Sequence, residues 1–599
     1  VQDGELRDAV KAAPAMVVPS ALLEGPVVER WARTVNWSKI DIVVCLGLGT
    51  GLVVDLIRER SDAHVMVFEP RAGVIKSVLS TRPLSTHKVQ IHGDAVRLRG
   101  QLRGACTFGV KVMFYAPSWA RKELAESVSE IEAIIRDAKQ LTLVNENTER
   151  EFGREWSDLI LESMLDFTAK VPVNRLFGSL DGVPGVVVAS GPSLDENIDV
   201  LKELEGRVAI IALNSSLKAL DAKGITPTML VTVESKNIVN MVSDSPSVEK
   251  MVFAPGLHTH PDLLELPFKS VLPAVSANKG PAAWLSTVAN LVPLGVGGSV
   301  ACLAFSIAEL LGCDPVVLVG QNCALAGSRM YAEGTALDNL SYEVVEDGMV
   351  RMASTAPLKE IGLIDEKIKI TPGRVFKHFS VPAWGGQGEV FTMPQLNTYR
   401  LWFEEKAHVM KGQRRLVNAT EGGAHIDGFE EIPLAQLRDE IWDRGEIDIV
   451  ERLLDAERQT SPLDAFVLAR ALRDEARTCK KARKLALKAK QSARKVIGFV
   501  AKRRTHTRES CKEVSRLEKL EIQIRRLTPE ATLLDSYVSR ALELVRREAI
   551  RETAESPEEG TRQSLEHSCA IFEEIANTAA TLAPRLEEVA AKLEQQGRN

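Results

Sequence analysis

Val186-Val-Val-Ala-Ser190-Gly-Pro-Ser193-Leu-Asp-Glu196 is the stretch that decides the fold of the central part of this chain. Its apolar residues form a run of the length typical of a buried strand, and the residues from Ser190 to Ser193 form a turn. Ser193 and Glu196 have the S-x-x-E spacing of a capping box, which marks the start of a helix. The stretch therefore predicts a strand, a tight turn and a helix.

The same alternation continues along the chain. Strands are expected at 185–189, 208–213, 229–233 and 315–319, and helices at 194–204, 216–222 and 299–311. This order predicts a doubly wound α/β domain, whose parallel sheet binds ligands at the carboxyl ends of its strands. The polar residues that follow these strands are therefore the candidate site residues: Asn214, Glu234, Gln321 and Asn322.

Two glycine-containing turns lead into helices, one at Ser190–Ser193 and one at 295–300. Free N–H groups and the helix dipole favour a phosphate at such a turn, and Gly191 would let a ligand approach the backbone closely. Gly298 and Ser299 offer a second anion site of the same kind. The alternative is that both turns only begin well-capped helices.

The region before residue 166 predicts a nucleotide-binding βαβ unit. An apolar run leads into Gly47-Leu-Gly-Thr-Gly51, a helix follows, and a second strand at 64–68 ends at Glu69. An acidic residue in that position commonly binds a ribose. Residues 141–144 are expected to form another strand. Together, the glycine motif and Glu69 would also suit an S-adenosylmethionine site, so a methyltransferase dependent on that cofactor is a rival interpretation.

The region from residue 432 to the end predicts long helices, because it is rich in Ala, Leu, Lys, Arg and Glu. Residues 476–508 contain 13 basic residues and no acidic one. This segment is either a solvated helix face or a docking surface for an acidic macromolecule. The chain is thus expected to have three domains, at 1–165, 166–431 and 432–599.

Composition excludes several classes of protein. The 599 residues are 45% hydrophobic and carry a net charge of -6, which argues against nucleic-acid binding as the main function. The eight scattered cysteines have no zinc or disulfide spacing, so no metal site is expected. The same absence predicts a reducing compartment. Neither a membrane span nor a signal peptide is recognisable, which predicts a cytoplasmic protein without membrane partners. The oligomeric state is left open.

Five motifs follow one another through the central region: Ser190-Gly-Pro-Ser-Leu194, Ile225-Thr-Pro227, Gly297-Gly-Ser-Val300, Leu311-Gly-Cys-Asp314 with Val319-Gly-Gln321, and Asn418-Ala-Thr-Glu-Gly-Gly423-Ala-His-Ile-Asp-Gly428. In this order they closely resemble the motility-associated factor (Maf) glycosyltransferases. The flanking regions are also similar to that family, so the resemblance covers nearly the whole chain. It implies a degenerate Rossmann-like domain, a sialyltransferase-like catalytic domain and a helical domain.

The resemblance implies transfer of pseudaminic or legionaminic acid, both nonulosonic acids, from a CMP-activated donor to Ser or Thr of flagellin. The CMP-sugar is a donor substrate, and no separate cofactor is implied. In the related sialyltransferases the G-P-S-L turn and an Asn after the next strand contact the donor. The donor-binding residues expected here are Ser190, Gly191, Pro192, Ser193, Asn214, Glu234, Gly298, Ser299, Gln321 and Thr420.

Metal-free chemistry is expected. The sequence has no Asp-x-Asp pair, by which many transferases hold a divalent ion over a nucleotide diphosphate. A CMP-sugar has a monophosphate leaving group, so backbone N–H groups and a helix N-terminus would suffice to stabilise it.

Activation of the acceptor hydroxyl is assigned to Glu421, His425 and the position of Asn322, with His258 and His260 as further candidates. For Glu421 the alternative is a tight turn capped by a neighbouring polar side chain. Family members usually have Asp where this chain has Asn322, and an amide cannot act as a base. A non-catalytic protein that binds flagellin is therefore a second rival interpretation.

Overall fold

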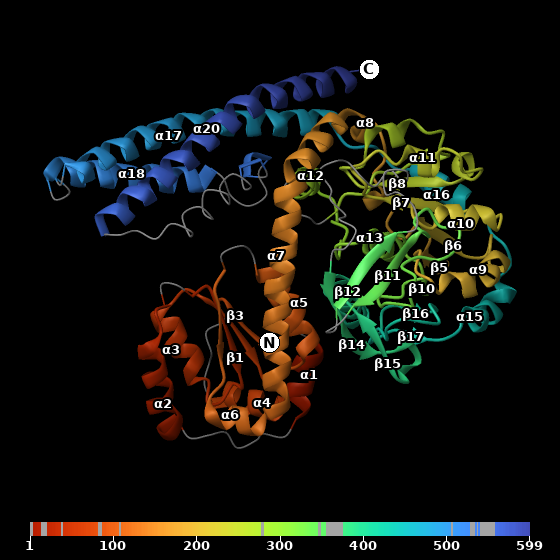
Figure 1. Cartoon of the computed structure of the whole chain (residues 1–599), viewed down its shortest axis with the longest axis horizontal. Helices are drawn as coiled ribbons and strands as arrows, with labels where there is room; N and C mark the ends of the chain where they lie inside the picture. The colour runs from red at the N-terminus through yellow and green to blue at the C-terminus, as the bar shows by residue number, and fades with distance from the viewer. Residues whose placement is uncertain are drawn as a thin grey trace. The chain divides into compact units, whose positions relative to one another are not determined.

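The computed structural model describes residues 4–13, 21–37, 40–81, 87–106, 110–276, 281–345, 349–354, 375–502, 504, 507–527, 533–535, 537–538 and 557–598. The chain forms two compact units, one of Val1–Thr148 with Glu404–Val409 and one of Glu149–Phe403 with Met410–Asn599. The three-domain division remains a prediction. The α/β class with a helical C-terminal region is confirmed (Figure 1).

The first unit is built on a parallel sheet in the order β3-β2-β1-β4. Alternate residues of β1 face opposite layers: Val43 and Cys45 pack with α3 and α4, whereas Val44 and Leu46 pack with α5 and α7. Because both faces are covered, every residue of β1 is buried, as in other doubly wound sheets. The elements are β1 (Ile42–Leu46), β2 (His64–Phe68), β3 (Val89–His92), β4 (Val112–Tyr115), α1 (Gly4–Ala12), α2 (Ala21–Thr34), α3 (Leu52–Arg60), α4 (Ala72–Thr81), α5 (Ala95–Ala105), α6 (Ser118–Glu123) and α7 (Ala125–Glu162).

Residues 141–144 continue helix α7, so the strand expected there is wrong. Thr142 donates its hydroxyl to the carbonyl of Ala138, 2.9 Å away, as a threonine inside a helix can. A run of four residues, three of them apolar, does not distinguish a strand from a helix, and the helix-forming residues around it decided the conformation.

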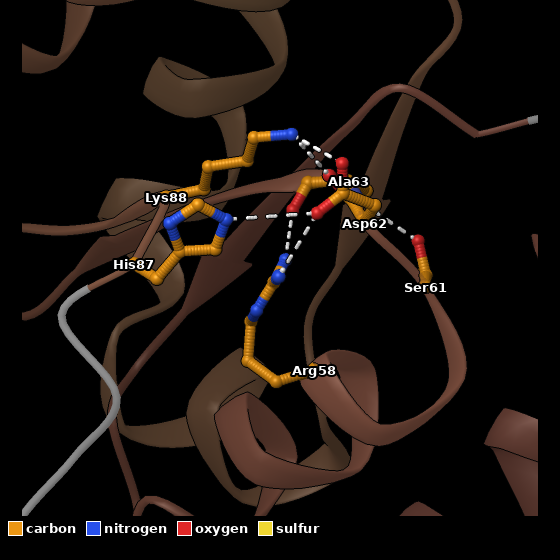
Figure 2. Close-up of polar contacts among 6 residues, drawn as sticks. All are labelled: Arg58, Ser61, Asp62, Ala63, His87 and Lys88. Atoms are coloured by element: carbon orange, nitrogen blue, oxygen red, sulfur yellow. Dashed lines mark hydrogen bonds and ion pairs between the residues drawn. The ribbon is translucent and has the colours of Figure 1, made fainter.

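An ion cluster fixes the turn between α3 and β2 in this unit (Figure 2). Arg58 donates to the carbonyl of Ala63 at 2.7 Å and to the carboxylate of Asp62 at 3.3 Å, and Lys88 donates to the same carboxylate. His87 Nε2 lies 3.7 Å from Asp62. The hydrogen bonds from Lys88 and then Arg58 lower the pKa of Asp62. These bonds stabilise the fold above the ordinary pKa of aspartate, and this stabilisation is lost as the pH falls. It is small because the Asp62 side chain is highly exposed.

The second unit contains an eight-stranded parallel sheet in the order β17-β16-β10-β5-β6-β7-β8-β9. The four strands predicted from the sequence are confirmed to within one residue at each end. The strands are β5 (Gly185–Val188), β6 (Ala209–Leu213), β7 (Met229–Thr232), β8 (Val252–Pro255), β9 (Ser270–Val271), β10 (Val316–Val319), β16 (Leu416–Asn418) and β17 (Glu430–Glu431).

Helices cover this sheet on both faces. Val186, Ile210 and their neighbours share a core with α9, α10 and α15, and α13 packs against β5, β6 and β10. The three helices predicted between the strands are confirmed, each beginning within one residue of the expected position. The helices around the sheet are α8 (Met164–Thr168), α9 (Leu194–Glu203), α10 (Leu217–Ala222), α11 (Val239–Val242), α12 (Pro281–Val288), α13 (Val300–Leu311), α14 (Pro394–Met410), α15 (Leu434–Ile441) and α16 (Ile449–Arg458).

Strand order places a topological switch between β5 and β10. From β5 the chain adds β6, β7, β8 and β9 on one side, and then returns to place β10 on the other side of β5. Doubly wound sheets bind ligands at such a point, because the loops diverge there and leave room at the carboxyl edge. The Ser190–Ser193 turn and Gln321-Asn322 follow these two strands.

Smaller sheets extend this edge. One has three antiparallel strands, β11 (Leu340–Val345), β12 (Met349–Ser354) and β13 (Val375–Lys377), and the other is a hairpin of β14 (Phe379–Pro382) and β15 (Glu389–Thr392). The backbone N–H of Leu325 donates to the carbonyl of Phe391 at 2.7 Å, which attaches the hairpin to the segment after β10.

The C-terminal part of the second unit consists of α17 (Ala465–Ala501), α18 (Arg508–Leu527) and α20 (Pro557–Gln596). Helices α17 and α20 lie side by side over much of their length (Figure 1). Buried alanines of α17, such as Ala476, Ala482 and Ala486, allow close approach and share one core with α20, α12 and α8. No helix of the described residues is long and apolar enough to cross a membrane.

Candidate functional site

The carboxyl edge of the large sheet brings the predicted binding residues to one side. Ser190–Ser193 follow β5, Asn214 follows β6, Glu234 lies beyond β7, Gln321 and Asn322 follow β10, and Thr420 follows β16. Their convergence results from parallel strands, whose carboxyl ends lie at the same edge.

The turn after β5 is tightly packed against the loop after β10. The N–H of Gly191 donates to the carbonyl of Gly320 at 2.9 Å. A Cβ on Gly191 would lie 2.2 Å from Asn322 Oδ1 and 2.4 Å from that carbonyl oxygen. Glycine is thus required at position 191 by packing within the protein.

The capping box predicted at Ser193 and Glu196 does not form. Ser193 has helical backbone angles, and its side chain makes no capping bond to its own helix. Its hydroxyl donates instead to Asn322 Oδ1 at 2.9 Å, and its N–H donates to the same atom at 3.3 Å. Asn322 therefore anchors the turn, and its oxygen accepts both bonds without needing a charge.

Free N–H groups were expected at this turn, and this expectation is wrong. The N–H groups of Leu194, Asp195 and Glu196 donate to the carbonyls three residues earlier, at 2.9, 3.3 and 3.1 Å. Donors for a ligand must therefore come mainly from side chains. Ser190 and Ser215 share a hydroxyl hydrogen bond of 2.8 Å beside the turn.

The ends of β6 and β7 add an amide and a carboxyl group. Asn214 Oδ1 accepts the hydroxyl of Thr232 at 3.2 Å, which orients the amide of this half-buried residue. Burial raises the pKa of Glu234, against a smaller lowering by the backbone N–H of Lys236. An amide and a carboxyl group can both form hydrogen bonds with polar atoms of a sugar or a base.

The loops after β10 and β16 are joined by Thr420, whose hydroxyl accepts the N–H of Gln321 at 3.3 Å. Both residues are buried, and Gln321 Oε1 has no hydrogen-bond partner among the described residues. A buried amide oxygen without a partner is costly unless a ligand or water binds it.

The second glycine-rich turn caps helix α13. Ser299 Oγ accepts the N–H of Cys302 at 3.3 Å, so this serine caps the helix, as the alternative interpretation expected. Gly298 has a φ of 89°, and a Cβ there would lie 3.4 Å from the ring of Tyr399. Donor contact by these two residues remains a prediction.

His425 has the arrangement of an oriented base. Its Nδ1 lies 2.9 Å from Glu431 Oε2, and this buried carboxylate also accepts N–H groups of Gly385 and Ile426 and the amide of Asn418. A carboxylate that accepts Nδ1–H leaves Nε2 as the free acceptor of a proton. The N–H of Ala424, next to His425, donates to the carbonyl of Asn322 at 2.8 Å, which ties this loop to the switch point.

Glu421 has two structural partners. Its Oε1 accepts Asn197 Nδ2 at 2.7 Å and the N–H of Leu434, the first residue of α15, at 2.8 Å. Its backbone lies in the left-handed region, with φ 57°, which costs a non-glycine residue about 1–2 kcal/mol. The catalytic role of Glu421 remains a prediction beside this structural one.

Replacing Glu421 with Gln separates these two roles. The amide oxygen of Gln can still accept both hydrogen bonds, so we expect a thermal midpoint and a turnover close to those of the wild type. Thermal unfolding and single-turnover kinetics would measure the two effects. A fall in turnover of about 10²- to 10⁴-fold, with the midpoint unchanged, would instead assign Glu421 to activation of the acceptor.

The other two histidines have structural environments. His258 stacks on Trp156 with ring centroids 4.5 Å apart, and burial lowers its pKa to about 4, which makes it a weak base. His260 Nδ1 accepts the N–H of Asp262 at 3.4 Å and caps a short 3-10 helix, Pro261–Glu265.

The glycine motif of the first unit is filled by the protein's own side chains. Glu69 is fully buried, accepts the N–H of Leu48 at 3.0 Å, and pairs with Arg71 at 2.7 and 3.0 Å. A Cβ on Gly47 would lie 2.4 Å from the ring of Trp119. The carboxylate and the glycine turn are thus used internally, which weighs against the methyltransferase interpretation.

Sequence reasoning missed several residues at the sheet edge: Ser215, Thr232, Glu431, Asp195, Arg329 and Tyr331. Ser215, Arg329 and Tyr331 lie in loops without periodicity, whereas Thr232, Glu431 and Asp195 lie in strands or a helix and have partners that are distant in the chain. No group of three or more His, Cys, Asp or Glu suited to a metal ion occurs among the residues that the structure describes.

Comparison with known proteins gives two matches. No curated protein matches the chain. The chain is similar to the solved structure of the MAf glycosyltransferase from Magnetospirillum magneticum AMB-1, with 14% sequence identity and a TM-score of 0.47, over 98% of this chain and 88% of that one. Residues 161–328, which include the site residues from Ser190 to Asn322, match the family described as 6-hydroxymethylpterin diphosphokinase MptE-like.

Proposed function

We propose that this protein is a glycosyltransferase that moves a nonulosonic acid, pseudaminic or legionaminic, from its CMP-activated form to Ser or Thr hydroxyls of flagellin. The observation that supports it most is the placement of the Ser190–Ser193 motif, Asn214, Asn322 and the loop of His425 at the switch point of one parallel sheet. The flagellin acceptor and the cytoplasmic location come from the sequence alone.

The donor is held by neutral groups in this proposal. The hydroxyls of Ser190 and Ser215 and the amide of Asn214 are assigned as its side-chain donors, and the dipole of α9 favours the phosphate. Glu234, whose pKa is raised by burial, faces the nucleoside or sugar rather than the phosphate. Departure of CMP is helped by the donor's own carboxylate, which favours an oxocarbenium-like centre.

The acceptor step moves one proton. The flagellin hydroxyl oxygen forms a bond to the anomeric carbon while the bond from that carbon to the phosphate oxygen breaks, and the electron pair leaves with CMP. The hydroxyl proton passes to His425 Nε2, and Glu431 stabilises the resulting imidazolium through Nδ1. Asn322 serves this scheme by anchoring the turn, so an aspartate is not required at that position.

One experiment distinguishes the candidate functions. The protein is incubated with CMP-pseudaminate or CMP-legionaminate and flagellin, and intact mass is measured. Parallel reactions contain S-adenosylmethionine, or ATP with 6-hydroxymethylpterin, because the matched family carries that description. A mass increase of flagellin by one nonulosonate supports the proposal. Methyl or diphosphate transfer in the parallel reactions, or binding of flagellin without transfer, contradicts it.

The basic segment of α17 contains both paired and unpaired cations in the structure. Lys480 pairs with Glu587 at 2.6 Å, and Lys490 pairs with Glu573 at 2.5 Å. A second set of cations on this helix is exposed and has no ion-pair partner among the described residues: Lys481, Arg483, Lys484 and Lys488. The unpaired set is the part that can attract an acidic partner.

Reversing the charge of the unpaired set to Glu should lower flagellin modification at low salt by about tenfold or more, because a field of like charges raises the encounter rate. CMP affinity, measured by calorimetry, should not change. The matched control reverses four exposed lysines outside the helical region: Lys122, Lys218, Lys250 and Lys269. Wild-type rates in the first variant, or an equal loss in the control, would show that α17 does not dock flagellin.

A further inference from the structure

A short segment, Arg329–Glu333, crosses the first turn of α9 and is called the strap here. The guanidinium of Arg329 pairs with Asp195 Oδ2 at 2.6 Å, and the N–H of Glu333 donates to Asp195 Oδ1 at 2.9 Å. The N–H of Ala332 donates to the carbonyl of Ser190 at 2.9 Å. Three bonds thus fasten the strap, two to the first turn of α9 and one to the Ser190–Ser193 turn on which the proposed donor site is built.

Asp195 is an unexpected residue at a site for an anion. It lies in the first turn of the helix, where its charge would repel a phosphate if nothing else contacted it. Its side chain is 27% exposed and that of Arg329 is 48% exposed, so their ion pair adds little to the stability of the fold. Both carboxylate oxygens of Asp195 bind the strap, so holding the strap explains why an aspartate stands at this position.

Tyr331 lies in the middle of the strap. Its hydroxyl has no hydrogen-bond partner among the described residues, and burial raises its pKa, so the group is a neutral donor. The hydrogen bond from the adjacent Ala332 to Ser190 places Tyr331 beside the first turn, where the N–H groups of α9 are already used.

We propose that Asp195 is a positioning residue, which ties the strap to the Ser190–Ser193 turn and thereby holds Tyr331 against the bound donor nucleotide. The proposal rests on the proposed function for the identity of the nucleotide. It predicts a change in anion affinity opposite to the one that charge repulsion alone would give. Removing a carboxylate beside an anion site should tighten anion binding, whereas loosening the strap should weaken it.

The test measures CMP binding by calorimetry and thermal unfolding for four variants. Asp195→Ala removes both acceptors, and we expect CMP affinity to fall tenfold or more with little change in the thermal midpoint. In Asp195→Asn the amide oxygen can still accept a strap bond, so affinity should stay within about threefold of wild type. Tyr331→Phe should lose as much affinity as Asp195→Ala, and the double variant should lose no more than either, because both act through one contact.

Asp199→Ala is the matched control, since it removes the same charge from the same helix. Within the described part of the chain, the Asp199 carboxylate pairs with Lys223 alone, at 2.7 Å. The control variant should not weaken binding. Equal or tighter CMP binding by Asp195→Ala overturns the inference and leaves the proposed function standing. If the wild-type protein does not bind CMP, the proposed function fails, and inorganic phosphate becomes the probe. Weaker phosphate binding by Asp195→Ala than by Asp199→Ala then still supports the strap, and equal binding overturns it.

Discussion

Replacing His425 with Asn should lower the rate of flagellin modification by about 10²- to 10⁴-fold, the range expected when a general base is lost. Asparagine keeps a side-chain N–H that can donate to Glu431, so the loop should keep its conformation. It has no nitrogen that can accept the acceptor's proton. CMP affinity should stay near that of the wild type, because the histidine belongs to the acceptor side of the proposed site. Single-turnover kinetics and calorimetry would measure the two effects separately.

His260 provides the control for this variant, because its Nδ1 accepts a backbone N–H and it has no buried carboxylate partner such as Glu431. His260→Asn should modify flagellin at nearly the wild-type rate. Equal losses in both variants, or an unchanged rate in His425→Asn, would show that His425 is not the base.

Replacing Gly191 with Val should destabilise the second unit and abolish CMP binding together. The first added carbon would lie 2.2 Å from Asn322 Oδ1 and 2.4 Å from the carbonyl oxygen of Gly320, so the turn or the loop after β10 must move. Overpacking of this kind typically costs 1–3 kcal/mol, and about 2 kcal/mol would lower the thermal midpoint by several degrees. Thermal unfolding with and without CMP would measure both effects.

Asn214→Ala is the variant that separates binding from folding at this edge. Among the residues that the structure describes, its amide oxygen accepts only the hydroxyl of Thr232. The residue is half-buried, so the thermal midpoint should change little while CMP affinity falls. A Gly191→Val protein with an unchanged midpoint would mean that the turn is looser than its hydrogen bonds to Gly320 and Asn322 indicate.

Local sequence was sufficient to predict the strands at 185–319 and the helices between them. Each strand is a short apolar run that ends at a polar residue, and each helix follows a turn that glycine or serine can form. Such signals depend on neighbours in the chain, and the periodicity of apolar residues carries them. The parallel arrangement follows from the same alternation, since a helix must cross between successive parallel strands.

Residues whose partners are distant in the chain were not predictable in this way. Ser193 could have capped its own helix with Glu196, but its hydroxyl donates to Asn322, which is 129 positions away. The pairing of His425 with Glu431 depends on the return of the chain through β16 and β17, two short strands without a local signal. Glu69 lies at the position of a ribose ligand, yet Arg71 and the glycine turn use its charge.

The sequence by itself determined the class of fold, the glycine-containing turns and the strand ends at which a ligand can bind, because these depend on residues close together in the chain. Only the tertiary structure decided the strand order, which puts β10 beside β5 and so brings Asn322 to Ser193. It also decided that the N–H groups of the turn are used internally and that Asp195 holds the strap. Packing selects among the hydrogen-bond partners that a side chain could have, and that selection requires contacts between segments far apart in the sequence.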